Sequence, residues 1–468
     1  MPDLPNETDF GNVRAATLNA DAVFVGGAPV LDQVTGDVVA RGRSPRSRLV
    51  GIFGTSQAQN NHYAGQTFAG VPCALTASTG LEDKSSAGFA AYCEMLTGGR
   101  VEFPRSLNYG VNGYNTRTLL PFVAQAAAAM KAAGCGCVVL IAFANETLGG
   151  VPYSDSIVNG ATIEKTFTDA GIVVIWLAEY PRGNAASTTY RLSGTALQEH
   201  MRIRRWLADR ANNQNVFTVD PWPILADPLS TTGDMKTGLS VDYLHLQGPG
   251  SVRAAQVLTP VLNMLFPPAQ ILPVNAADVY STANPVGIIS RNPMLDGTAG
   301  VLSAGNTGSV ADNWGQGATP SGLTAAMSKI TDADGYPGQR IVISGTAAAT
   351  TSWELMRTDT VLGVSDLAIG SIVKAAGELQ LAAGATGILA CYLHLSAGSQ
   401  NSRSPAPFGT ATLGLIPDLA VGGPVVLPTL TVPTGATLVR CSLFVTPLAG
   451  ATVNATITLK RFGALYAA

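Results

Sequence analysis

Three uninterrupted apolar runs in the first half of this chain place the strongest constraint on its fold. They read LVGIFG over residues 49–54, CVVLIAF over 137–143 and GIVVIWLAEYP over 171–181. Strands buried on both faces of a parallel sheet are apolar throughout, whereas strands with one face in water alternate with polar residues. The three runs therefore predict central strands of a parallel sheet.

Helical patterns separate these runs. The Ala-rich stretch LPFVAQAAAAMKAAG ends at Gly134, and SGTALQEHMRIRRWLADRAN, over residues 193–212, has the period of an amphipathic helix. A fourth strand is expected in NVFTVDPW, from Asn215. Alternating strands and helices predict a three-layer α/β/α fold, whose ligand site lies at the carboxyl ends of the strands.

The pattern changes after residue 290. Runs such as GQRIVISGT, GILACYLHLS and ATVNATITLKRF alternate between apolar and polar residues, which predicts a jelly-roll-like β-sandwich. We expect four segments: an N-terminal extension with a hairpin and a docking role (1–47), an α/β domain (48–267), a linker (268–290) and the β-sandwich domain (291–468). Because the linker contains prolines and all the candidate site residues precede it, we expect the role of the β-sandwich to be separable from the chemistry.

A serine, an aspartate and a histidine form the first group of candidate functional residues. Ser56 follows the first apolar run, and Asp242 precedes His245 by three residues in VDYLHLQGPG. Serine becomes a good nucleophile when an imidazole takes its proton and a carboxylate orients that imidazole. The alternatives are a helix N-cap for Ser56 and a surface position for His245.

Gly113 and Asn145 form a second group. Gly113 lies in NYGVNGYNTRTLL, before a helical pattern, and Asn145 follows the second apolar run in CVVLIAFANETLGG. Backbone N–H groups at a tight turn and a carboxamide can stabilise the oxyanion of an acyl transfer. Alternatively, each residue occupies an ordinary turn.

The order Ser56, Gly113, Asn145, Asp242 and His245 resembles the SGNH (GDSL-like) hydrolase family over roughly residues 48–266. Two family motifs differ: Gly-Asp-Ser reads Gly54-Thr55-Ser56, and Gly-x-Asn-Asp reads as residues 143–146, Phe-Ala-Asn-Glu. The resemblance implies a carboxylic ester hydrolase, an SGNH-type acetylesterase, with Ser56 as nucleophile, His245 as base and Asp242 as its orienting group. It also implies an oxyanion hole from Ser56, Gly113 and Asn145.

The remaining histidines are weaker candidates. His62 lies close to Ser56 in sequence and is the rival base, but it lacks a nearby carboxylate, so we expect it to contact substrate together with Tyr114. His200 belongs to the amphipathic helix and is expected to face solvent or another helix. His394 belongs to the β-rich half and is expected to be structural.

Aromatic residues of the β-rich half have two interpretations. Their rings could form a platform that stacks on sugar, or they could fill the core of the sandwich. The residues concerned are Trp314, Trp353, Tyr336 and Tyr392.

Composition excludes several classes of partner. The net charge is -3 and only 13% of the residues are charged, so the basic surface of a nucleic-acid-binding protein is missing. The one basic cluster is interpreted as an exposed linker, and it comprises Arg41, Arg43, Arg46 and Arg48.

Membrane, redox and metal signals are also missing from the sequence. No apolar run reaches the roughly 20 residues of a spanning helix, and MPDLPNETDF lacks the features of a secretory signal. The six cysteines show no zinc spacing and are interpreted as buried free thiols. We expect no metal, no cofactor and no membrane insertion.

These features predict a serine esterase that removes small acyl groups, O-acetyl above all, from a bacterial surface polysaccharide. The missing signal, the low charge and the terminal β domain resemble bacteriophage tail-spike or tail-fibre deacetylases. That resemblance implies a homotrimer, made in the cytoplasm and then virion-associated or extracellular. The alternatives are an inactive adhesion protein of a phage tail and an intracellular acyl-ester or thioester hydrolase.

Overall fold

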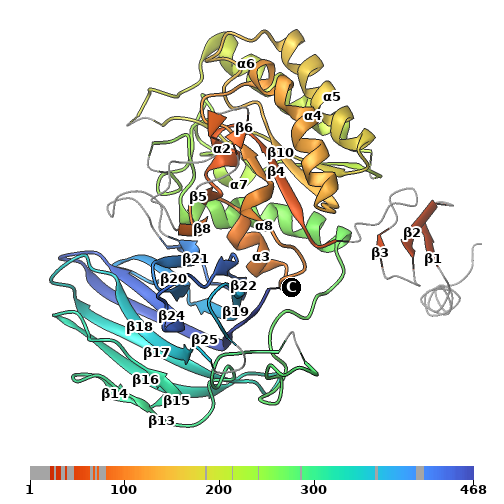
Figure 1. The fold of residues 1–468 in the computed structure, drawn as a ribbon. Coiled ribbons are helices and arrows are strands. Elements are labelled where there is room, and N and C mark those ends of the chain that lie inside the picture. The colour runs from red at the N-terminus through yellow and green to blue at the C-terminus, as the bar shows by residue number, and fades with distance from the viewer. Residues whose placement is uncertain are drawn as a thin grey trace, which may run out of the picture.

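The computed structural model (Figure 1) describes most of the chain, namely residues 22–25, 28–32, 37–38, 47–63, 67–68, 71–72, 81–184, 187–212, 214–240, 242–284, 287–363, 367–406 and 416–467. Several residues named above lie outside these ranges. They are Arg41, Arg43, Arg46 and Cys73.

A five-stranded parallel sheet forms the centre of the first half, in the order β12–β11–β10–β4–β9. The three apolar runs contain β4, β10 and β11, as expected, and NVFTVDPW contains β12. The bounds are β4 (Val50–Gly54), β9 (Asn108–Gly110), β10 (Cys137–Ile141), β11 (Val173–Leu177) and β12 (Val216–Val219).

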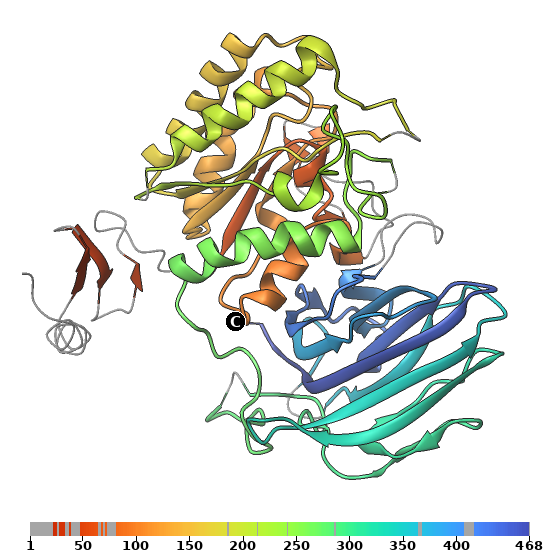
Figure 2. The ribbon, with the colours of Figure 1, turned by 180° about the vertical axis from the view of Figure 1, so that it is seen from behind.

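Helices cover both faces of this sheet, which makes three layers (Figure 2). On one face, α4 (Thr116–Ala132), α5 (Tyr153–Asp169) and α6 (Gly194–Arg210) share a core with Val138 and Leu140 of β10. On the other face lie α3 (Ala90–Leu96), α7 (Trp222–Leu225) and α8 (Gly248–Leu265), whose core includes the alternate side chains of β10. Burial of both faces explains why the strands read as continuous apolar runs. We call this three-layer region, residues 47–265, the α/β part.

The second half consists of two sheets that enclose an apolar core, and we call residues 299–466 the β part. One sheet has eight strands in the order β13–β15–β18–β24–β20–β21–β8–β5, and the other has seven, β14–β16–β17–β25–β19–β22 with β23 paired to β19. The strands of the β part are β13 (Ala299–Val301), β14 (Thr307–Gly308), β15 (Val310–Gly315), β16 (Leu323–Thr331), β17 (Pro337–Thr346), β18 (Trp353–Val361), β19 (Ile372–Leu381), β20 (Ile388–Ala397), β21 (Gln400–Ala406), β22 (Val421–Val426), β23 (Leu430–Thr431), β24 (Leu438–Pro447) and β25 (Thr452–Tyr466).

The eight-stranded sheet includes two strands from the α/β part. β8 (Leu81–Ser85) runs parallel to β21, and β5 (His62–Tyr63) pairs with β8 in the antiparallel sense. The two parts of the chain are therefore joined by backbone hydrogen bonds as well as by the linker. The separation of the roles of the two parts stays a prediction, and these paired strands have to be kept in any test of it.

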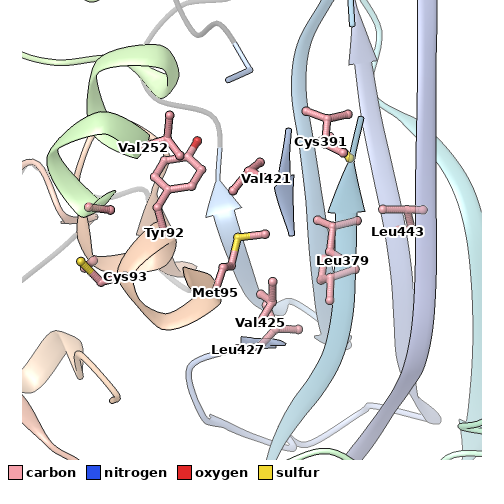
Figure 3. Close-up of a cluster of buried hydrophobic side chains, with 14 of the residues drawn as sticks. Tyr92, Cys93, Met95, Val252, Leu379, Cys391, Val421, Val425, Leu427 and Leu443 are labelled. Carbon is pink, nitrogen blue, oxygen red and sulfur yellow. The ribbon is translucent and has the colours of Figure 1, made fainter. Parts of the chain in front are cut away.

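A buried apolar seam joins the same two parts. Figure 3 shows Tyr92 and Met95 of α3 facing Val421 and Val425 of β22 and Leu379 of β19. All five side chains belong to one continuous core cluster that runs from the parallel sheet into the β part. Removing the β part would expose this face of α3 to water.

A buried ion pair lies at the edge of the seam. Lys84 Nζ donates to both carboxylate oxygens of Glu94, at 2.6 and 2.7 Å, and to the carbonyl of Val426 at 3.1 Å. Glu94 also accepts a hydrogen bond from the backbone N–H of Phe103 at 2.7 Å. Both charged side chains are 2% exposed or less, so each depends on the other for compensation of its charge.

Two small antiparallel sheets complete the described structure. β1 (Ala22–Val25), β2 (Ala28–Asp32) and β3 (Asp37–Val38) form one, which stands beside the α/β part in both views (Figures 1 and 2). β6 (Thr67–Phe68) and β7 (Val71–Pro72) form the other. The hairpin or edge strands were expected in the runs that contain β1 and β3, and both of these strands pair with β2 rather than with each other.

Most of the aromatic residues proposed as a sugar platform belong to the core. Trp314, Trp353 and Tyr392 are 1%, 2% and 4% exposed, respectively, and Tyr336 lies under the guanidinium of Arg461 at 4.2 Å. The core interpretation therefore fits the three buried rings.

The cysteines within the described residues are buried free thiols, as expected. They are Cys93, Cys135, Cys137, Cys391 and Cys441.

We predict that Lys84→Ala lowers the free energy of unfolding by about 3–5 kcal/mol, because it leaves the Glu94 carboxylate buried without a partner. Urea denaturation of the full chain measures this change. Lys165→Ala is the matched control, because Lys165 forms an exposed pair with Asp169 on α5 and its loss should have little effect. A loss below about 1 kcal/mol for Lys84→Ala would show that the ion pair does not hold the seam.

Candidate active site

The turn between β4 and α2 (Ser56–Gln59) carries Ser56 at the carboxyl edge of the parallel sheet. Gly54 makes this turn possible, since a Cβ atom there would lie 2.0 Å from the carbonyl oxygen of Ile141 on β10. Thr55 N–H donates to the same carbonyl at 3.0 Å. The close approach of the two strand ends brings Ser56 next to the loop that follows β10.

Ser56, His245 and Asp242 form one chain of hydrogen bonds. His245 Nδ1 lies 2.7 Å from Asp242 Oδ2, and His245 Nε2 lies 2.8 Å from Ser56 Oγ. Because an ionised carboxylate can only accept, Nδ1 carries the proton and Nε2 accepts the hydroxyl hydrogen of Ser56. This is the arrangement in which an imidazole can take the proton of a serine as the serine attacks.

The loop before α8 holds Asp242 rigidly. Its Oδ1 accepts hydrogen bonds from the backbone N–H groups of Leu244 and His245, at 2.9 and 2.8 Å. Burial alone would raise the pKa of Asp242, but the hydrogen bonds and charge of His245 and the two N–H groups outweigh it and lower the pKa well below its usual value. Asp242 is therefore ionised near neutral pH.

Two further contacts fix the same loop. Tyr243 adopts a left-handed conformation with φ 57°, and its carbonyl accepts a hydrogen bond from the N–H of Gly183 at 2.8 Å. Gln57, the neighbour of Ser56, donates its side-chain N–H to the carbonyl of Leu244 at 3.2 Å. This second contact ties the serine turn directly to the histidine loop.

Gly113 and Asn145 lie in loops at the same edge of the sheet. Gly113 follows β9 and adopts a left-handed conformation with φ 75°, just before Asn115, the N-cap of α4. Asn145 follows β10, is 8% exposed and donates its side-chain N–H to the carbonyl of Tyr114 at 2.8 Å. One N–H of the Asn145 carboxamide therefore fixes its orientation, and the second is available to another acceptor.

Glu146 joins the two loops, and it was not among the candidate residues expected from the sequence. Its Oε1 accepts from the N–H of Thr116 at 2.6 Å, and its Oε2 accepts from the hydroxyl groups of Thr116 and Ser156 at 3.2 and 2.8 Å. Burial raises the pKa of Glu146, and these hydrogen bonds oppose the rise. The sequence did contain one signal for Glu146: it directly follows Asn145, at the position of the Asp in the Gly-x-Asn-Asp motif of SGNH hydrolases.

Glu179, after β11, supports the loop from the other side. Its Oε1 accepts the N–H of Phe143 at 2.6 Å. Burial raises the pKa of Glu179 to about 7, against the influence of the buried guanidinium of Arg182. Nothing in the spacing of the sequence marked this residue.

The position of His62 does not support the expected substrate contact. Its side chain is 0% exposed, Nε2 donates to the carbonyl of Phe103 at 2.9 Å, and Nδ1 accepts from the carboxamide of Asn108 at 3.0 Å. With both nitrogens bonded inside the protein, His62 has none left for a substrate or for Ser56. Tyr114 is half-buried, and its ring packs against Phe122 at 5.9 Å.

The other histidines are structural. His200 is buried and faces a neighbouring helix, where its ring lies 5.2 Å from Trp222 of α7. His394 packs against Phe444 at 5.1 Å and bonds Asn401 at 2.9 Å.

Neither a metal cluster nor a spanning helix occurs within the described residues. No three or more His, Cys, Asp or Glu side chains there are grouped so as to hold a metal ion. None of the helices described is both long and apolar enough to cross a membrane.

The proteins that this chain is similar to are distant. No protein-family model and no curated protein matches it. Among solved structures, a GDSL-like lipase from Bacteroides thetaiotaomicron is 11% identical, with 46% of this chain and 87% of the lipase covered and a TM-score of 0.33. A carbohydrate esterase of family 3 from Talaromyces cellulolyticus is 13% identical, with 46% and 95% covered and a TM-score of 0.30. A β-sandwich carbohydrate-binding module is 12% identical, with 33% and 57% covered and a TM-score of 0.23. Likeness at this distance carries no conclusion about what the chain binds or cleaves.

Burial of His62 predicts a pH-dependent stability. Burial is the main cause, and the charge of nearby Lys84 the second, of a lowered His62 pKa of about 3. In the unfolded chain His62 has its ordinary pKa of about 6.5, so as the pH falls the unfolded chain binds this proton before the folded chain does. The free energy of unfolding therefore keeps the whole contribution of neutral His62 above about pH 6.5 and loses it progressively below that pH. The loss between pH 7.5 and pH 5 is about 2 kcal/mol.

His62→Gln should remove this one proton from the pH dependence, because glutamine can keep both hydrogen bonds without titrating. Urea denaturation of both proteins at the two pH values measures the difference. An unchanged pH slope in the variant would show that His62 titrates normally in the folded chain.

Proposed function

We propose that this chain is a serine esterase of SGNH type that removes O-acetyl groups from a carbohydrate through an acyl-serine intermediate. The observation that carries the proposal is the hydrogen-bonded chain of Ser56, His245 and Asp242, at 2.8 and 2.7 Å. It stands at the carboxyl edge of a parallel sheet, beside a fixed carboxamide. Nucleophile, base and orienting group meet there in the geometry that acyl transfer requires.

In the first half of the reaction, His245 Nε2 takes the hydroxyl proton of Ser56 while Oγ attacks the ester carbonyl. Negative charge develops on the former carbonyl oxygen, and the N–H groups of Ser56 and Gly113 and the carboxamide of Asn145 are the proposed donors to it. Asp242 stabilises the imidazolium that forms. His245 then gives its proton to the leaving alkoxide, and the alcohol departs.

In the second half, water replaces the alcohol. His245 removes a proton from the water as it attacks the acyl-serine, and the same donors stabilise the second oxyanion. Collapse of this intermediate returns the proton to Ser56 Oγ and releases acetate. Each step uses groups that the chain itself supplies.

The carbohydrate part of the proposal has indirect support. The β part is joined to the α/β part through one shared sheet and one core, which suits a chain that must hold a large substrate while it cleaves a small group from it. A bacterial surface polysaccharide is the substrate class we propose. An extracellular or virion-associated site of action and a homotrimer stay predictions from the sequence.

Acetate release from a panel of O-acetylated bacterial polysaccharides tests the function. We expect release by the natural chain, and Ser56→Ala and His245→Ala should each lower the rate by about 10⁴–10⁶, because the three residues act as a unit. Asp242→Asn should cost less than either. The same order should appear with p-nitrophenyl acetate.

His62→Gln is the matched histidine control, and it should retain activity because His62 does not contact Ser56. Activity lost on His62→Gln but kept on His245→Ala would refute the assignment of the base. A chain that cleaves neither substrate would instead be an inactive adhesion protein. A preference for acyl-CoA over acetylated sugar would favour an intracellular thioester hydrolase.

Glu146 should act through the loops that it joins. Asn145→Ala should lower kcat by roughly 10²–10³ with little change in KM, because it removes one oxyanion donor. Glu146→Gln weakens the hydrogen bonds to Thr116 and Ser156 and so displaces the neighbouring Asn145 carboxamide. A displaced oxyanion donor can lower kcat by up to about 10².

The double variant of Asn145 and Glu146 separates positioning from general stability. Its loss of kcat should be clearly smaller than the product of the two single losses, since both changes disturb one group. Fully multiplicative losses would mean that Glu146 does not position Asn145.

A further inference from the structure

The edge of the eight-stranded sheet farthest from the α/β part is split open. β15 pairs with β18 at one residue pair only, Gly315 with Arg357, whereas β18 pairs with β24 from Trp353 to Val361. The register between β13 and β15 also shifts. Ala299 lies opposite Val310 and Val301 lies opposite Gly315, so a step of two residues on β13 matches a step of five on β15. Relative to β13, β15 therefore has extra residues between Val310 and Gly315, and they form a bulge in this strand.

Side chains anchor this bulge. Asn313 adopts a left-handed conformation with φ 63°, and its carbonyl accepts a hydrogen bond from Thr358 Oγ1 at 3.0 Å. The carboxamide of Asn292 donates to the carbonyl of Asp312 at 2.6 Å, and the indole of Trp314 donates to the carbonyl of Asn292 at 3.0 Å. The separation between β15 and β18 is therefore a built feature, of the kind that proteins keep next to ligand sites.

A cleft of about 490 Å³ opens where the two strands separate, within the usual size range of ligand pockets. A second hollow of about 390 Å³ continues along the same edge, and Arg357 forms part of both walls. Five side chains with planar polar groups line the first cleft: Arg291, Asn313, Gln316, Arg357 and Asp359.

Two of the three charged side chains in the cleft, Arg357 and Asp359, are held by ion pairs. Asp359 accepts two hydrogen bonds from the guanidinium of Arg440, at 2.6 and 3.0 Å, and Arg357 donates to Glu354 at 2.9 Å. Arg291 is exposed and has no ion pair with another described residue. Fixed carboxylates beside the arginines disfavour a polyanion such as nucleic acid, and the polar lining disfavours an apolar ligand.

A ligand with many hydroxyl groups fits this chemistry. Each hydroxyl both donates and accepts, and adjacent hydroxyls match the paired donors of a guanidinium or the mixed groups of a carboxamide. We propose that the cleft between β15 and β18 binds a stretch of glycan, at a site separate from Ser56. The identity of the ligand as carbohydrate rests on the proposed function.

The position of the cleft determines which substrates it can affect. β5, which follows the serine turn, lies at the opposite end of the same sheet (Figure 1), six strand spacings from β15. At about 4.8 Å per spacing, roughly 30 Å separates them. One polysaccharide chain can reach both places, whereas a monosaccharide ester or p-nitrophenyl acetate occupies the catalytic site alone.

The experiment measures binding without turnover. In the full chain carrying Ser56→Ala, we add Arg291→Ala and Asn313→Gly, because Arg291 is exposed and glycine accepts the left-handed conformation of Asn313. Calorimetry measures affinity for a panel of purified O-acetylated capsular polysaccharides and their deacetylated forms. Arg340→Ala, an exposed arginine on β17 of the other sheet, is the matched control.

We expect the cleft variant to bind polysaccharide at least tenfold more weakly, in acetylated and deacetylated form alike, while Arg340→Ala leaves the affinity unchanged. In the active chain, which keeps Ser56, Arg291→Ala and Asn313→Gly together should lower kcat/KM for polysaccharide about tenfold. The rate of p-nitrophenyl acetate hydrolysis should not change. Equal binding by the cleft variant and its parent, or no binding to any glycan, would overturn the proposal. Binding that depends on the cleft in a chain without esterase activity would support the glycan site and refute the proposed function.

Discussion

The buried contact between α3 and β22 is the interaction on which the rest of the structure depends. Met95 and Tyr92 on one side and Val421 and Val425 on the other belong to a single core cluster, so the apolar surface of each part is covered by the other. Lys84 and Glu94 are excluded from water by the same contact. The strand that carries Lys84 extends the sheet of the β part, and the serine turn lies only a few residues before that sheet begins.

The fold was predictable where burial is reflected in the local sequence. β4, β10 and β11 are apolar throughout because helices cover both faces of their sheet. β16 and the first half of β25 alternate because only one of their faces is buried. β9, β5 and β8 escaped prediction because they are short or polar. The partner of β8 is β21, more than 300 residues away, and no local pattern can report such a pairing.

The candidate site was predictable to the extent that its chemistry needs particular residue types at strand ends. Ser56, Asp242 and His245 were identified in this way, and the structure brings them together. Glu179 was not identified, because a carboxylate that accepts a backbone N–H group from another loop leaves no spacing signal. Glu146 was also missed, although its place beside Asn145 was a signal. His62 was misjudged for the opposite reason, since closeness in sequence to Ser56 says nothing about the direction of a side chain.

A chain with this much β structure risks edge-to-edge association, yet the outermost strands of the two large sheets leave little for a second molecule to pair with. The eight-stranded sheet ends in β5 and β13, of two and three residues, and the other large sheet begins with the two-residue β14. The fourth edge, β22, is longer, and α3 lies against it. Short or covered edges are the means by which β proteins stay free of aggregation. The α3 seam thus protects the solubility of the β part as well as its position.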